Sequence, residues 1–160
     1  MPQRYDYQNT TVIQRIIRSA GTIAIVGLSA NHLRASHFVG FYLQRHGYHI
    51  IPVNPREHEV LGERSYGSLR EVDSPIDCVN VFRDPSAVPE IVDDAIAIGT
   101  RALWLQFGVI SPAAATAVAA GLDVVMDRCI KVEHARHRGR MHWLGFNTGQ
   151  ISARRGRTLQ

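Results

Sequence analysis

Cysteine is scarce in this sequence. Its two cysteines, Cys78 and Cys129, lack a C-x-x-C spacing, which excludes a disulfide framework and the usual thiolate zinc patterns. Long apolar runs are also missing, since no stretch approaches the ~18–20 residues that span a bilayer. The polar residues 1–10 lack the apolar centre of a signal peptide. The sequence therefore predicts a reduced, cytoplasmic protein without a membrane segment.

Lysine is almost absent, because Lys131 is the only one and arginine supplies every other fixed cation. Genomic base composition explains such a bias without any function, yet several arginines stand where a phosphate ligand would bind. The net charge is +4, part of it from Arg154, Arg155 and Arg157. This basic tail lacks interleaved aromatic residues, so it is interpreted as a solvated end, and nucleic acid is not expected as a partner.

Short, continuous apolar runs recur along the chain, and their length suits strands buried on both faces of a parallel sheet. Five strands are predicted: Ile23–Val26, His49–Val53, Cys78–Phe82, Ala102–Phe107 and Leu122–Met126. With 160 residues, the chain fits one domain. We expect it to cover residues 1–142, and residues 143–160 to form a C-terminal extension with a basic, flexible end.

Helices are predicted between the strands from apolar spacing and from glycines that end them. They start at Thr10 or Thr11, at Ser36 (with Phe38, Val39, Tyr42 and Leu43 inward), after Asp84 and at Ser111-Pro112, and end before Gly21, Gly47, Gly99 and Gly121. The link Glu57–Val72 is predicted as a loop with one short helical turn. Strands that alternate with helices indicate an α/β, doubly wound Rossmann-like parallel sheet of about five strands.

Ligands of such sheets bind beyond the carboxyl ends of the strands. After the first strand, Gly27 permits a sharp turn into a helix whose N-terminus carries free N–H groups. Neutral donors and one cation follow, at Ser29, Asn31, Ser36 and Arg34. This loop predicts a cradle for a diphosphate. The alternative is that Ser36 only caps the helix and Arg34 is solvated.

The glycine fingerprint of dinucleotide-binding enzymes is missing. Gly27 is the only glycine of the loop, since Gly40 lies within the predicted helix. An NAD enzyme also needs an acidic residue after the second strand, where this chain has Val53-Asn54-Pro55-Arg56. Arg56 favours a phosphorylated ribose. Coenzyme A (CoA) and NADP are the ligands that combine a diphosphate with such a ribose.

Motifs at all five strand ends support one of these ligands. They are Gly27-x-Ser29 with Asn31, Arg34 and Ser36; Val53-Asn54-Pro55; Val81-Phe82-Arg83; Trp104-Leu105-Gln106-x-Gly108; and Met126-Asp127-Arg128-Cys129-x-Lys131-x-Glu133-His134. The set resembles the family of small, stand-alone CoA-binding proteins. That family is similar to the nucleotide domain of the succinyl-CoA synthetase α subunit and of acyl-CoA synthetases that form ADP. The resemblance covers residues 10–138.

The resemblance implies a role for each motif. Ser29, Arg34 and Ser36 would hold the diphosphate, and Asn54 and Arg56 the ribose with its 3′-phosphate. Phe82 and Arg83 would flank the adenine. Trp104 and Gln106 are assigned to the pantetheine arm, with core packing as the alternative. Cys129 is either a small hydrophobic residue or a thiol that forms a mixed disulfide with CoA.

No catalytic apparatus is evident. Glu133 and His134 are neighbours in sequence and point apart, and the histidines at 134, 137 and 142 lack a zinc spacing, so we expect them at solvated or interface positions and expect no metal. The sequence predicts a protein that binds CoA or acyl-CoA and is not an enzyme. The alternatives are a small NADP-dependent oxidoreductase and an interaction module with a decayed site. A homodimer, through residues 143–146, and a partner enzyme stay open.

Overall fold

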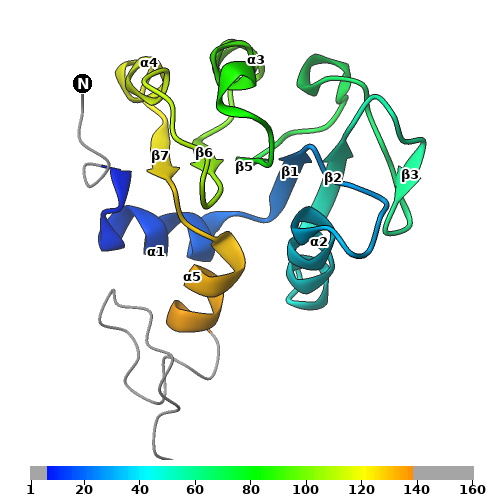
Figure 1. Ribbon diagram of the computed structural model, residues 1–160. Coiled ribbons are helices and arrows are strands. Elements are labelled where there is room, and N and C mark those ends of the chain that lie inside the picture. Colours follow the sequence, from blue (N-terminus) through cyan, green and yellow to red (C-terminus); the bar gives the residue numbers. More distant parts are fainter. Residues whose placement is uncertain (1–6, 139–160) are drawn as a thin grey trace, which may run out of the picture.

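The computed structural model describes residues 7–138, and its centre is a five-stranded, all-parallel sheet (Figure 1). The strand order is β2-β1-β5-β6-β7, with β1 at Thr22–Val26, β2 at His49–Val53, β5 at Cys78–Val81, β6 at Ala102–Leu105 and β7 at Asp123–Met126. The predicted doubly wound sheet is confirmed, and only the strand ends move by a residue or two. The strand order reverses between β1 and β5, where such sheets bind ligands.

Helices cover both faces of this sheet (Figure 1). One face carries α1 (Thr10–Ser19), α2 (Ala35–Arg45) and α5 (Ile130–His137), and the other carries α3 (Val88–Ile98) and α4 (Ala114–Ala119). The apolar side chains of α3 are buried where the spacing predicts, and Gly99 ends that helix in the left-handed conformation. Among residues 7–138, no helix has the length and apolar character needed to span a bilayer.

Three helix starts differ from the prediction, and one of them is α4, which begins at Ala114 and not at Ser111-Pro112. Asn9, and not Thr10 or Thr11, caps α1, because its side-chain oxygen accepts hydrogen bonds from the N–H groups of Thr11 and Val12 at 2.8 and 3.2 Å. The second helix, α2, begins before Ser36, which is buried in its first turn. Phe38 was expected to face inward, but it is 54% exposed because Val39, Gly40 and Leu43 form the buried face.

The link between β2 and β5 contains more structure than predicted. The expected short turn is a 3₁₀ helix, η2, at Leu69–Glu71. The hairpin of β3 (Glu59–Val60) and β4 (Glu63–Arg64) is not evident from the sequence, because its strands have only two residues each. Reciprocal backbone bonds hold Tyr66 to the end of β2, with Tyr66 N–H donating to Pro52 and Asn54 N–H to Tyr66.

The expectation of solvated histidines is wrong for α5. His134 and His137 are both buried, and so are Glu133 and Arg136. Nη1 of Arg136 contacts both carboxylate oxygens of Glu133, at 2.9 and 3.1 Å. Among the described residues, Nε and Nη2 of Arg136 have no hydrogen-bond partner, so the pair offsets the cost of burying these charges only in part. His142 and residues 143–160, including the predicted domain boundary, lie outside the described residues.

His134 is held by an aromatic cage. Its Nδ1 lies 2.8 Å from the hydroxyl of Tyr42, and its ring meets those of Tyr42, His46 and Tyr48 edge-on. Burial, with a smaller contribution from the charges of His46 and Arg138, lowers the pKa of His134 to about 4. The imidazole is therefore neutral in the folded protein near pH 7.

Candidate functional site

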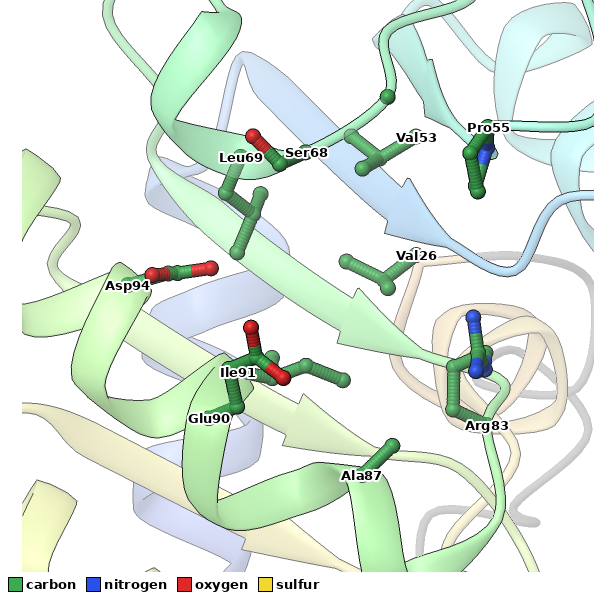
Figure 2. Close-up of a pocket in the computed structure, with 11 residues that line it drawn as sticks. Val26, Val53, Pro55, Ser68, Leu69, Arg83, Ala87, Glu90, Ile91 and Asp94 are labelled. Carbon is green, nitrogen blue, oxygen red and sulfur yellow. The ribbon is translucent and has the colours of Figure 1, made fainter.

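Two hollows adjoin at the carboxyl ends of β1, β2 and β5, where the strand order reverses. The larger, which we term the polar cleft, has a volume of about 420 Å³. It is lined by Gly27, Ser29, Arg34, Ala35, Ser36, Asn54, Arg56, Glu57 and Phe82. The smaller, the apolar pocket, has a volume of about 140 Å³ (Figure 2). It is lined by Val26, Val53, Pro55, Gly67, Ser68, Leu69, Arg83, Ala87, Glu90, Ile91 and Asp94.

The segment after β2 separates the two hollows. Val53 and Pro55 line the apolar pocket, whereas Asn54 and Arg56 line the polar cleft. Residues 54–57 form a turn after β2, in which Glu57 N–H donates to the carbonyl oxygen of Asn54 at 3.2 Å, and this turn directs Arg56 and Glu57 into the polar cleft. The chain after β5 also contributes to both hollows, with Phe82 in the polar cleft and Arg83 at the apolar pocket. Figure 2 shows Arg83 beside Pro55.

Gly27 brings the ends of β1 and β5 together. Its φ is +90°, a region that side chains other than glycine rarely adopt. A Cβ atom here would also collide with the carbonyl oxygen of Phe82. The predicted need for glycine in this turn is thereby explained by two independent constraints, the dihedral angle and the contact.

Side chains of the loop between β1 and α2 hold its backbone in place. The hydroxyl of Ser36 accepts from Ser29 N–H at 3.1 Å, and the hydroxyl of Ser29 accepts from Asn31 N–H at 3.0 Å. A third hydrogen bond follows, in which the side-chain oxygen of Asn31 accepts from Leu33 N–H at 3.0 Å. Asn31 does not line the polar cleft, so its observed part is to shape the loop.

The positive end of α2 faces the polar cleft. No side chain among the described residues caps this helix, and Arg34, Ala35 and Ser36 at its start all line the cleft. A helix N-terminus attracts anions through its free N–H groups and its partial positive charge. The cleft adds the guanidinium groups of Arg34 and Arg56, both exposed and without an ion pair in the described part of the chain. Glu57 is the one carboxylate that the described residues contribute to its lining.

Asn54 joins the two loops of the cleft. Its amide nitrogen donates to the carbonyl oxygen of Leu28 at 3.0 Å, and its side-chain oxygen accepts from Arg56 N–H at 3.0 Å. The first bond fixes the distance between the two loops, and the second orients Arg56. Asn54 thus has a positioning role, in addition to the ribose contact predicted for it.

Four of the predicted site residues line neither hollow: Asn31, Trp104, Gln106 and Cys129. Trp104 is fully buried, and its Nε1 donates to the carbonyl of Arg128 at 2.8 Å. Gln106 is 5% exposed, and its side-chain oxygen lies 3.2 Å from Asn80 Nδ2 and 3.3 Å from Ile130 N. Core packing, the alternative left open for both, agrees with this burial, and the pantetheine contact stays a prediction.

Cys129 is half-buried at the start of α5, and its role stays a prediction. Cys78 is buried in the core as predicted, where burial raises the pKa of its thiol. No group of three metal-ligating side chains is present among residues 7–138.

Several lining residues were missed from the sequence. Ser68 and Leu69 reach the apolar pocket because the link after β4 returns along β2. Glu90, Ile91 and Asp94 reach it from α3. The apolar spacing of α3 predicted that Ile91 is buried. Nothing in the sequence indicated which residues of α3 meet the end of β2.

The sheet order and the two hollows define a Rossmann-type nucleotide-binding domain. A family model described as a CoA binding domain matches residues 21–135, and the chain belongs to this family. The chain is 41% identical over 124 residues to the uncharacterized protein YneT of Bacillus subtilis (strain 168), covering 77% of this chain and 92% of YneT. The resemblance to stand-alone CoA-binding proteins is confirmed.

Solved structures agree on the fold. A hypothetical protein from Pyrococcus horikoshii OT3 superposes with a TM-score of 0.77 at 36% identity, covering 80% of this chain and 91% of that one. An acetyl-coenzyme A synthetase from Ca. Korarchaeum cryptofilum gives a TM-score of 0.59 at 18% identity, covering 69% of this chain and 26% of that one. The second likeness shows the fold alone.

Proposed function

We propose that this protein binds coenzyme A through its 3′-phosphorylated ADP part and performs no reaction on it. The polar cleft takes the diphosphate and the ribose 3′-phosphate, and the apolar pocket takes the adenine. The observation that carries this proposal is the alternation of residues 53–56 between the two hollows, which matches a ligand with phosphates on one side of its ribose and a base on the other.

Each hollow suits its part of the ligand. In the polar cleft, the start of α2 and Arg34 would neutralise the diphosphate, and Arg56 would neutralise the 3′-phosphate. In the apolar pocket, Val26 and Val53 offer flat apolar contact to a base, and Arg83 at the mouth can stack on it. Phe82 lies on the phosphate side, so we assign it to a packing contact with the ribose. Arg83 alone is then assigned to the contact with the adenine.

Two observations support binding without catalysis. Among residues 7–138, no histidine or cysteine lines either hollow, and the serines of the polar cleft hold its own loop. Glu133 and His134 are buried in α5 and line neither hollow. We infer a binding module that serves as a carrier or a sensor of CoA or acyl-CoA.

Calorimetric titration with CoA, dephospho-CoA and NADP tests the proposal. We expect saturable binding of CoA and affinity for dephospho-CoA that is lower by about tenfold or more, since a charge-assisted hydrogen bond contributes ~1.5–3 kcal/mol. In Arg56→Gln this difference should disappear. Arg45→Gln is the matched control, because Arg45 is exposed on α2 outside both hollows.

Each other outcome has a definite meaning. Equal binding of CoA and dephospho-CoA by the unchanged protein would show that Arg56 does not bind the 3′-phosphate. Tighter binding of NADP than of CoA would favour the alternative hypothesis, a small NADP-dependent oxidoreductase. A folded protein that binds none of the three would refute the proposal.

A further inference from the structure

The apolar pocket carries a carboxylate without a partner. Its polar side chains are Arg83, Ser68, Glu90 and Asp94. Asp94 already accepts from Nε of Arg70 at 2.6 Å. Glu90 is exposed, and within residues 7–138 no hydrogen bond or ion pair engages its carboxylate. An unengaged acceptor therefore faces a pocket whose other walls are largely apolar.

Glu90, the unengaged acceptor of this pocket, and Arg83, its charged donor, lie at different places. Glu90 is in the first turn of α3, four positions before Asp94, so both lie on one side of that helix. Figure 2 shows Glu90 beside Ile91 and on the Asp94 side of the pocket, whereas Arg83 lies beside Pro55. Because Pro55 adjoins Arg56 of the polar cleft, a base whose ribose lies near Pro55 turns its far edge toward α3.

We propose that Glu90 is a specificity-determining residue that selects a 6-aminopurine over a 6-oxopurine. This assignment rests on the proposed function, because it takes the base of the ligand to occupy the apolar pocket. An ionised carboxylate can only accept hydrogen bonds. The amino group of adenine donates to it, whereas the oxygen of a 6-oxopurine would turn lone pairs toward it.

The other charged groups of the pocket are placed or engaged elsewhere, because Arg83 lies on the Pro55 side and Asp94 already accepts from Arg70 at 2.6 Å. The hydroxyl of Ser68 can donate or accept, so it suits either base. A 6-oxopurine also carries a proton on the neighbouring ring nitrogen, which offsets part of the repulsion at its oxygen. Glu90 is exposed before a ligand binds, which weakens its hydrogen bond further. We therefore expect a preference of about tenfold and not complete exclusion.

Calorimetric titration with adenosine 3′,5′-bisphosphate and inosine 3′,5′-bisphosphate tests the assignment, since these probes differ only at and around the 6-position. The unchanged protein should bind the adenosine compound about tenfold more tightly. In Glu90→Gln the ratio should fall to near one, because an amide can donate to the oxygen as well as accept from the amine. Asp93→Asn should keep the original ratio, since Asp93 is exposed on the same helix and does not line the pocket.

The failures of the two proposals look different. A preference that persists in Glu90→Gln, or adenosine binding without any preference in the unchanged protein, would overturn the role of Glu90 and leave CoA binding intact. A folded, unchanged protein that binds neither bisphosphate nor CoA would refute the proposed function, and the role of Glu90 with it.

Discussion

Two polar regions of this molecule are built in opposite ways. At the polar cleft, Arg34 and Arg56 are exposed and have no ion pair in the described structure. In α5, Glu133 and Arg136 are about 1% exposed and contact each other at 2.9 Å. The exposed arginines are accessible to the anionic ligand that we propose for them, whereas the buried pair is shielded from water and belongs to the fold. Exposure alone does not mark a binding residue, because Arg45 is also exposed and lies outside both hollows.

The largest effect is expected at the buried pair. Glu133→Gln leaves the guanidinium of Arg136 buried without a counter-charge, which should lower the free energy of unfolding by about 3–5 kcal/mol. Chemical denaturation measures this loss. A double variant, Glu133→Gln with Arg136→Met, should recover much of it, because the unpaired charge is then removed. A single variant as stable as the unchanged protein would contradict the comparison.

Gly27→Ala tests the backbone turn that lines the polar cleft. The variant combines an unfavourable φ with a collision against Phe82, so we expect a loss of about 3 kcal/mol in stability and weaker CoA binding. Gly47→Ala is the matched control, because Gly47 has a φ of +91° and open space around it. Its cost should be only about 1 kcal/mol. Equal losses in the two variants, measured by denaturation, would show that the contact with Phe82 is unimportant.

The pH dependence of the free energy of unfolding tests the role of His134 in the buried region. Its pKa is about 4 in the folded protein against an ordinary 6.5, so below pH 6.5 the unfolded chain takes up a proton that the folded protein does not. Stability from this residue is complete above pH 6.5 and is lost as the pH falls toward 4. We expect about 2 kcal/mol of loss between pH 7.5 and 5. In His134→Asn, denaturation curves at the two pH values should differ by that much less, and an unchanged difference would exclude this histidine as the cause.

The smallest effect is expected at an exposed pair whose contacts are as short as those of the buried one. Nε and Nη2 of Arg15 each lie 2.8 Å from an oxygen of Asp123, which raises the pKa of the Arg15 guanidinium. Water screens such a pair, so Arg15→Gln should leave the denaturation midpoint almost unchanged. A loss as large as that of Glu133→Gln would mean that distance, and not burial, decides the strength of these pairs.

The sequence predicts the regions where apolar side chains fill the core. The sheet and α3 are found because continuous apolar runs and the spacing of Val88, Ile91, Val92 and Ala95 match their burial. The fifth helix is not predicted, because its buried face consists largely of charged residues and histidines, which apolar periodicity cannot detect.

The candidate site divides along the same line. The polar cleft is largely predictable, because its residues follow β1 and β2 directly in the chain. The apolar pocket is not, since Leu69 and Glu90 come from separate segments that only the folded chain brings together. Trp104 is a different case, because a large aromatic residue in a strand suits a ligand contact and a core position equally well, and its burial agrees with the second.

Residues 54–57 form a turn, in which Glu57 N–H donates to the carbonyl oxygen of Asn54 at 3.2 Å and Arg56 N–H donates to its side-chain oxygen at 3.0 Å. Substitution of Pro55 or Arg56 changes the lining of one hollow at a time. The loss or gain of a residue in the turn would break both hydrogen bonds and move Arg56 away from the polar cleft. The length of the chain between β2 and the β3–β4 hairpin is therefore constrained more tightly than its composition.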